Sequence, residues 1–231
     1  MDIGVVVFAQ AANQASLDVA MPSDAPQPAV LAAALAGRLI HDVMGPLSGV
    51  ISGLDLLGDP TARDLHVDAL ALATASARTL CEDMAFSRVL YGAGAAPMDA
   101  ASLEGLARGQ FVGARATLDW SMDLAAVSAT AGRTLLGFVR LAAAALAAGG
   151  VVKVNARAAS PGVVLSVEAT GPRARFFAET LTGLAGAPFS EGLIGKWAPA
   201  YQLWAAATSS GGTLSTKVSE TGVVLEARFP G

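Results

Sequence analysis

The first third of the chain carries apolar residues at the spacing of an amphipathic helix. Between residues 30 and 57 they recur three or four positions apart, on one stripe: Leu35, Leu39, Val43, Leu47, Val50, Leu54 and Leu57. A Gly-Asp-Pro sequence at 58–60 predicts the end of this helix. A second pattern of apolar and small residues predicts another helix over 61–91. Two long helices joined by so short a turn form a helical hairpin.

The remainder of the chain alternates between helical and strand periodicity. Residues 116–122 alternate apolar with polar side chains, as a half-buried strand does, and Ser-Pro-Gly at 160–162 indicates a turn between two β-rich runs. The pattern predicts helices over 102–111, 130–148, 176–184 and 198–209, and strands over 116–122, 151–158, 163–169, 214–218 and 223–229. Strands mixed with helices in this way predict an α+β fold, in which helices cover a sheet.

These patterns divide the chain into three segments. Prolines at 22, 26 and 28 with polar spacers predict a flexible N-terminal tail over 1–28. The helical hairpin then occupies 29–95, and the α+β domain occupies 96–231. A single hairpin has an apolar face and little to bury it against. We therefore expect two copies to pair as a four-helix bundle, which makes the protein a homodimer.

Composition narrows the possible partners. The 231 residues are 53% hydrophobic and 15% charged, which argues against a disordered chain. The formal net charge is -4 and no basic stripe is present, so a nucleic-acid partner is not expected. An apolar run at 5–12 lacks the preceding Lys or Arg of a signal peptide, and no longer run has membrane character. We expect no membrane association, a cytoplasmic protein, and a buried position for the single cysteine, Cys81.

The most informative segment is 41–47, HDVMGPL. His41 lies between stripe positions 39 and 43, so helical geometry points it away from the apolar stripe. It shares its face with small and polar residues, which are Arg38, Gly45, Ser48 and Ser52. Pro46 inside the helix costs about 3 kcal/mol and predicts a bend beside His41. A cost of that size next to an exposed histidine indicates a functional role. His66 has no such neighbours and is predicted to be a surface residue.

This segment resembles the H box of the sensor histidine kinases, in which a phosphoacceptor histidine is followed by an acidic residue and then by Pro-Leu. The hairpin resembles the dimerisation and phosphotransfer domain of the same enzymes. The resemblance implies that His41 is the phosphoacceptor and that Asp42 is an assisting carboxylate. The position four after the histidine often holds Thr or Asn in kinases with phosphatase activity, and here it is Gly45.

The second half resembles the kinase ATP-binding domain with its nucleotide site erased. Arg140 and Ala144 stand where that family places two metal-ligating asparagines, and Ala169 stands where it places the aspartate that reads adenine. Arg173 replaces a glycine of the same box. Arginine and alanine do not ligate Mg²⁺, and the loss of the aspartate leaves the base donors unpaired. We therefore expect the fold to remain and this chain to bind no ATP, no other cofactor and no metal ion.

An intact H box with an erased nucleotide site is similar to the alphaproteobacterial histidine phosphotransferases of the ChpT family. That resemblance implies a phosphorelay, in which phosphate passes from the receiver domain of a hybrid histidine kinase, through His41, to response regulator receiver domains of the cell-cycle type. The receiver supplies the acidic pocket and Mg²⁺. Neutral imidazole is the nucleophile, since histidine is largely neutral at cytoplasmic pH.

Docking of the receiver is expected on both helices of the hairpin. The predicted contact residues are Arg38, Gly45, Pro46, Leu47, Ser48, Val50 and Leu54 on the first helix, Met84, Ser87, Arg88 and Tyr91 on the second, and Arg173 and Arg175 on the α+β domain. Three alternatives remain open on the sequence: an active ATP-dependent histidine kinase, a non-catalytic dimeric scaffold that binds receivers, and a structural dimer with an unrelated second domain.

Overall fold

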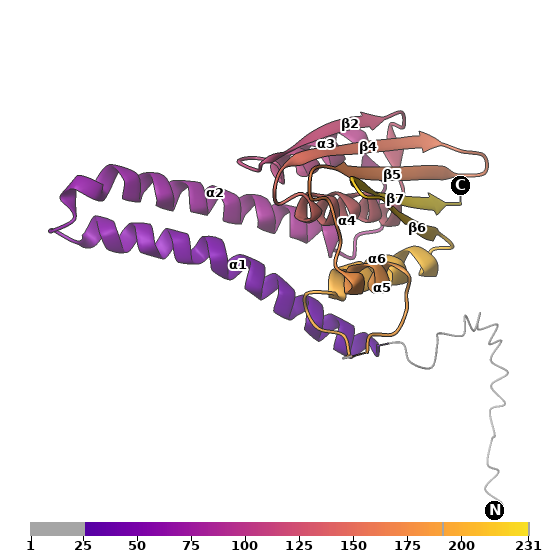
Figure 1. The fold of residues 1–231 in the computed structure, drawn as a ribbon, viewed down its shortest axis with the longest axis horizontal. Coiled ribbons are helices and arrows are strands. Elements are labelled where there is room, and N and C mark those ends of the chain that lie inside the picture. Colours follow the sequence, from indigo (N-terminus) through magenta and orange to yellow (C-terminus); the bar gives the residue numbers. More distant parts are fainter. Residues whose placement is uncertain (1–25, 191, 231) are drawn as a thin grey trace, which may run out of the picture.

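The computed structural model describes residues 26–190 and 192–230, so most of the predicted N-terminal tail lies outside the described residues. The hairpin is formed by α1, Pro28–Gly58, and α2, His66–Leu90, with the short 3-10 helix Arg63–Leu65 between them. Asp59 closes the turn, because its Oδ1 accepts hydrogen bonds from the backbone N–H and the hydroxyl of Thr61 at 2.8 and 2.6 Å. The two helices project from the rest of the molecule as a long arm (Figure 1).

Small residues let α1 and α2 approach closely. Gly53 is buried, and a Cβ atom there would lie 2.6 Å from the carbonyl oxygen of Ala69 and 2.8 Å from the Cβ of Ala73. Both alanines are themselves buried. At this level the contact between the two helices is therefore made of glycine and alanine, while several larger apolar residues of α1 are exposed.

Those larger residues form an exposed apolar face on the hairpin. On α1, Ile40, Met44, Ile51 and Leu54 are each at least half exposed, and on α2, Val67 and Leu70 are exposed as well. With about 100° of rotation per residue, positions 40, 44, 47, 51 and 54 follow one stripe. Cys81 is exposed too, which contradicts its predicted burial. We call the α1 stripe of positions 40, 44, 47, 51 and 54 the apolar face.

Among the described residues, α1 is the one helix long and apolar enough to cross a membrane, and none of its tested window is buried. A single helix of this kind is weak evidence for a membrane span. Proline lies inside it at position 46, and α1 changes direction near its middle (Figure 1).

The second half is a two-layer α+β sandwich, as predicted. Its five-stranded sheet has the order β2-β4-β5-β7-β6, in which β2 and β4 are parallel and the other pairs are antiparallel. The strands are β2 Ala116–Met122, β4 Gly150–Ala158, β5 Val163–Thr170, β6 Thr213–Val218 and β7 Gly222–Phe229. Two further strands, β1 Met98–Asp99 and β3 Ala126–Val127, pair separately and were not predicted.

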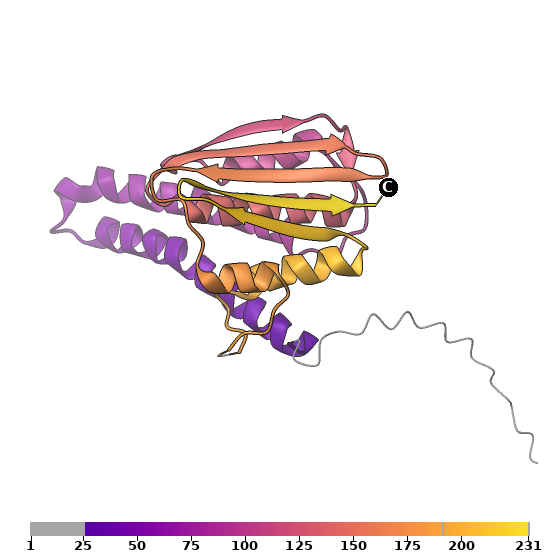
Figure 2. The same ribbon diagram turned by 45° about the vertical axis from the view of Figure 1, so that its right-hand side comes forward.

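Helices cover one face of this sheet (Figure 2). They are α3 Ala100–Gly109, α4 Ala129–Ala145, α5 Ala178–Leu184 and α6 Ala198–Ser209. The central helix α4 is the most buried, with Leu135, Leu136, Phe138 and Val139 fully enclosed. Its N-terminus is capped by the Ser128 hydroxyl, which accepts a hydrogen bond from the N–H of Ala131 at 3.3 Å. This rigid helix carries the residues that connect the sandwich to the hairpin.

Candidate functional site

His41 lies on α1 with its side chain 80% exposed, as predicted. Its Nδ1 atom is 3.5 Å from Oδ1 of Asp42, and its other ring nitrogen has no hydrogen-bond partner in the described part of the chain. Gly45 is one helical turn further on and has no atom of another element within 4 Å of where a Cβ would stand. The imidazole therefore stands on an open part of the helix surface, with one nitrogen toward a carboxylate and the other accessible.

Two arginines hold the carboxylate of Asp42. From one turn earlier on α1, Arg38 donates through Nε to Oδ2 at 3.1 Å, and its Nη2 lies 2.9 Å from Oδ1. From α4 in the sandwich, Arg140 donates through Nη2 to Oδ2, also at 3.1 Å. The side chain of Asp42 is only 16% exposed, so these interactions are screened from solvent more than those of a surface pair. Its carboxylate is consequently fixed beside His41.

Arg140 was noted in the sequence for another reason than the contacts that it makes in the structure. It was assigned to an erased metal-ligand position, whereas the structure shows it crossing to the hairpin. Its Nη1 donates to the hydroxyl of Ser87 at 3.1 Å, and its guanidinium lies 5.6 Å from the centre of the Phe86 ring. Both of these α2 residues are buried. Arg140 therefore contacts one residue of α1 and two of α2, and attaches the sandwich next to His41.

Tyr91 adjoins this ion-pair network. Burial raises the pKa of its phenol, an effect that the nearby positive charge of Arg140 opposes. The phenol is therefore neutral at physiological pH. It contributes polarity to the network without adding a charge.

The predicted docking residues of the hairpin differ in their exposure and in the side of the helix on which they lie. Gly45 and Ser48 are exposed on the His41 side of α1, and the Ser48 hydroxyl donates to the Met44 carbonyl at 2.8 Å. Leu54, at 56% exposure, belongs instead to the apolar face, and Met84 of α2 is 40% exposed. Pro46, Leu47, Val50 and Tyr91 are partly buried, and Arg88 is exposed.

One docking residue needs correction. Ser87 is 4% exposed and its hydroxyl is bonded to Arg140, so it contributes little free surface. The predicted α2 residues nevertheless come together, because Met84, Ser87, Arg88 and Tyr91 line one cavity of about 610 Å³ with Leu39 of α1.

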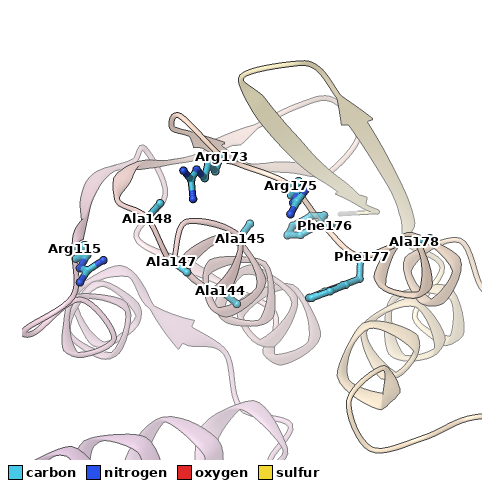
Figure 3. A pocket seen from close by; sticks show the side chains of 10 residues that line it. All are labelled: Arg115, Ala144, Ala145, Ala147, Ala148, Arg173, Arg175, Phe176, Phe177 and Ala178. Atoms are coloured by element: carbon cyan, nitrogen blue, oxygen red, sulfur yellow. The ribbon is translucent and has the colours of Figure 1, made fainter.

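A larger cavity of about 730 Å³ occupies the region that the sequence compares with the kinase nucleotide boxes. Ala144 and Arg173, two of the positions compared with the kinase boxes, line it (Figure 3). Ala169 is buried in the sheet instead, and Arg140 is turned toward Asp42. In the described residues, no group of three or more His, Cys, Asp or Glu is arranged to hold a metal ion.

Comparison with known proteins decides the family. The model of the histidine phosphotransferase C-terminal domain matches residues 100–222, more than half of the chain. The chain belongs to this family. The matched segment of the histidine phosphotransferase begins after the hairpin, so it does not include His41.

Individual relatives agree with this assignment. The histidine phosphotransferase is 36% identical over 63 residues to the protein phosphotransferase ChpT of Brucella abortus (strain 2308), a match that spans 27% of this chain and 29% of that relative. The structure of a bacterial phosphotransferase has the same fold, with a TM-score of 0.79 at 22% identity over 87% of this chain and 97% of that one. The structure of the Acinetobacter baumannii histidine kinase AdeS aligns less well, with a TM-score of 0.45 at 13% identity over 82% of this chain and 97% of that one.

Proposed function

We propose that this histidine phosphotransferase relays a phosphoryl group between receiver-domain aspartates through His41. The observation that carries the proposal is the environment of the imidazole. It is exposed to a partner, and it has a carboxylate beside Nδ1 that two arginines hold in place. A histidine with no functional role would not require this arrangement next to a helix-interior proline.

The chemistry follows from the two ring nitrogens. In the tautomer that carries its proton on Nδ1, facing Asp42, the lone pair is on Nε2. Nε2 attacks the phosphorus of an aspartyl phosphate in line, the N–P bond forms, and the P–O bond to the aspartate breaks, which returns a free carboxylate. The ring becomes a cation that keeps its Nδ1 proton, and the adjacent carboxylate of Asp42 stabilises that charge. Transfer to the next receiver is the reverse reaction.

Docking requires access to the His41 side of α1. Gly45 and Ser48 have small side chains, so the acidic pocket of a receiver, with its own Mg²⁺, can approach the imidazole. Pro46, Leu47 and Val50 are partly buried and lie roughly 120° or more around α1 from His41, so they are not part of this contact. Arg88 and Tyr91 are the candidates on α2. Arg38 is already bonded to Asp42, so its role toward a receiver is to present positive charge beside the carboxylate rather than to reach outward.

The apolar face fits the proposed homodimer. The centre of this stripe is roughly 100° around α1 from His41, since Ile40 and His41 are successive residues. Two hairpins that pair through this face cover Ile51 and Leu54 and leave both histidines open to receivers. Receiver domains are found on cytoplasmic signalling proteins, and a cytoplasmic location is proposed for the same reason.

Independence from ATP is the second half of the proposal. Arg140 is bound to Asp42 and Ser87, and Ala144 has no ligating atom, so the helix offers no metal site for a triphosphate. The phosphoryl donor is therefore an aspartyl phosphate. An active kinase and a non-catalytic scaffold are the competing functions, and neither is favoured by a specific contact.

A labelling experiment separates the three. Purified protein and its His41→Ala variant are incubated with Mg²⁺ and either radiolabelled ATP alone or a receiver domain of a hybrid kinase whose aspartate carries the radiolabelled phosphoryl group. We expect label on the wild-type chain only when the phosphorylated receiver is present, and none on His41→Ala. Label from ATP alone establishes a kinase. Receiver binding without labelled phosphotransferase supports the scaffold.

A further inference from the structure

The cavity beside the C-terminal half of α4 has strongly basic walls. Arg115, Arg173 and Arg175 line it, together with Phe176 and Phe177, above a floor of α4 and post-α4 alanines (Figure 3). None of the ten lining residues is acidic, although the whole chain has a net charge of -4. Alanine side chains make the floor hollow. The result is a recess of about 730 Å³, within the size range of small-ligand sites.

Sheet register explains why arginines so distant in sequence meet here. The parallel pairing of β2 with β4 places Ala116 opposite Gly150, and the antiparallel pairing of β4 with β5 places Val151 opposite Thr170. One end of the sheet therefore holds the start of β2, the start of β4 and the end of β5. Gly171 comes directly after β5 and lies against the segment between α4 and β4: a Cβ atom at Gly171 would be 2.6 Å from the carbonyl oxygen of Gly149.

The arginines have no ion-pair or hydrogen-bond partner in the part of the chain that the structure describes. The simplest structural role for them is to neutralise the negative end of the α4 dipole, an effect of about 0.3–1 kcal/mol for a cation. Three guanidinium groups are more than the neutralisation of one helix end requires. None of them is hydrogen-bonded to a carbonyl oxygen of α4 among the described residues, so their donors remain available. Guanidinium donors are suited to the paired oxygens of a phosphate.

An aromatic edge adds a second kind of contact. Phe177 lines the cavity and is 61% exposed, which is unusual for a large apolar side chain. The ammonium nitrogen of Lys196 lies 3.8 Å from the centre of its ring. Trp197 also packs against Phe177, with the two ring centroids 5.6 Å apart and the rings tilted by 56°. The part of the Phe177 ring that lines the cavity is the surface that a flat group would contact. The ammonium group of Lys196 thus adds a fourth positive charge beside Phe177.

We infer that this cavity binds a small aromatic phosphate ester without a metal ion. The phosphate would take the place of the missing acidic partners of Arg115, Arg173 and Arg175, and its flat group would lie against Phe177. Nothing in the lining would ligate Mg²⁺, since the lining offers no carboxylate, amide or imidazole side chain. The site is therefore distinct in chemistry from a metal-dependent nucleotide site, and it goes beyond the proposed relay through His41.

Calorimetric titration of the full-length protein with naphthyl phosphate and with pyrophosphate, both in EDTA, tests the inference. Both should bind. Arg173→Glu combined with Arg175→Glu should weaken both by at least about tenfold, as expected for charge-assisted hydrogen bonds. Phe177→Ala should weaken naphthyl phosphate and leave pyrophosphate unchanged. Arg157→Glu, which reverses one charge on exposed β4 where the double variant reverses two, is the control and should have no effect.

Several results would overturn the inference. They are absence of binding by wild type, equal weakening by Arg157→Glu, and binding that requires Mg²⁺. A receiver domain that binds the wild type and loses affinity with Arg173→Glu and Arg175→Glu, while neither phosphate binds, would assign the arginines to protein contact instead. Neutral Arg173→Gln and Arg175→Gln variants guard against misfolding. His41→Ala should bind both phosphates normally, so failure of the relay and failure of this site are distinguishable.

Discussion

Arg140 and Asp42 are 98 positions apart in sequence, yet Nη2 of the arginine is 3.1 Å from Oδ2 of the aspartate. The arginine belongs to the central helix of the sandwich, and the aspartate is the immediate neighbour of the proposed phosphoacceptor. With side-chain exposures of 21% and 16%, the pair is mostly withdrawn from water. The position of the sandwich and the environment of His41 are therefore coupled through one ion pair.

Removing this pair should slow phosphotransfer. Arg140→Met leaves the carboxylate of Asp42 with Arg38 alone, so the carboxylate loses one fixed donor and its orientation toward Nδ1. A hydrogen bond to a charged group contributes about 1.5–3 kcal/mol, so we expect a fall of about tenfold or more in the transfer rate from a phosphorylated receiver. Rapid-quench kinetics at saturating receiver separates this rate from docking.

The double variant shows whether the two residues act together. If the pair is responsible, adding Asp42→Asn to Arg140→Met should slow transfer much less than the sum of the single effects. Arg140→Lys should recover part of the rate, because it keeps the charge without the planar fork. Arg157→Met is the control. Additive effects of the two substitutions would contradict the coupling.

The open surface beside His41 should be sensitive to size. Gly45→Ala and Gly45→Gln place progressively larger side chains one turn from the imidazole, where no other element lies within 4 Å of the Cβ position. Both should fold at least as stably as wild type, because glycine costs about 1 kcal/mol in a helix interior. We expect the affinity for a receiver to fall in the order Gly, Ala, Gln. Unchanged affinity for Gly45→Gln would place the receiver elsewhere.

The apolar face should control oligomeric state. Ile51 is 50% exposed on that face, and its neighbour Ser52 is on the His41 side. Ile51→Glu would bury a carboxylate in the proposed dimer contact, so the dimer dissociation constant should rise by at least about a hundredfold. Light scattering after size-exclusion chromatography measures this. Ser52→Glu, with the same charge one residue later, should remain dimeric. A wild-type monomer would refute the proposed bundle.

Close packing of the hairpin gives a stability prediction. A methyl group at Gly53 would meet the backbone of Ala69 and the side chain of Ala73, so Gly53→Ala should lower the free energy of unfolding by about 1–3 kcal/mol. Gly37→Ala makes the same change on the same helix with nothing within 4 Å, and should be neutral or stabilising by up to about 1 kcal/mol. Thermal denaturation followed by circular dichroism compares them. Similar melting temperatures would mean that the helices separate without cost.

Local patterns in the sequence predicted most of the fold. The helices and the five strands of the sheet lie within a few residues of their predicted bounds, because periodicity and turn residues act over short distances. The pairing of Met98–Asp99 with Ala126–Val127 was missed, since two residues show no periodicity. Leu54 was placed both on the predicted stripe and among the docking residues, and it is exposed. An apolar stripe does not reveal which of its members meet the neighbouring helix and which would meet a second chain.

The site was predicted less completely than the fold. His41 and Asp42 were recognised from a contiguous motif, and the placement of His41 on an exposed helix surface agrees with it. The partner role of Arg140 was missed because the two residues meet only through tertiary packing. Arg173 and Arg175 were noticed as charged, but their association with Arg115 depends on sheet register. Interactions between residues within one helical turn can be predicted from the sequence, whereas those that join distant segments cannot.

The link between Arg140 and Asp42 also sets an order of events in folding. Hairpin contacts form between helices that are adjacent in sequence, so α1 and α2 can associate soon after they leave the ribosome. The sheet must wait, because β2 pairs with β4 across a whole helix and β7 is the last element made. The carboxylate beside His41 acquires its second arginine only after α4 has settled against that sheet. Newly made chains therefore expose the histidine early but complete its surroundings late.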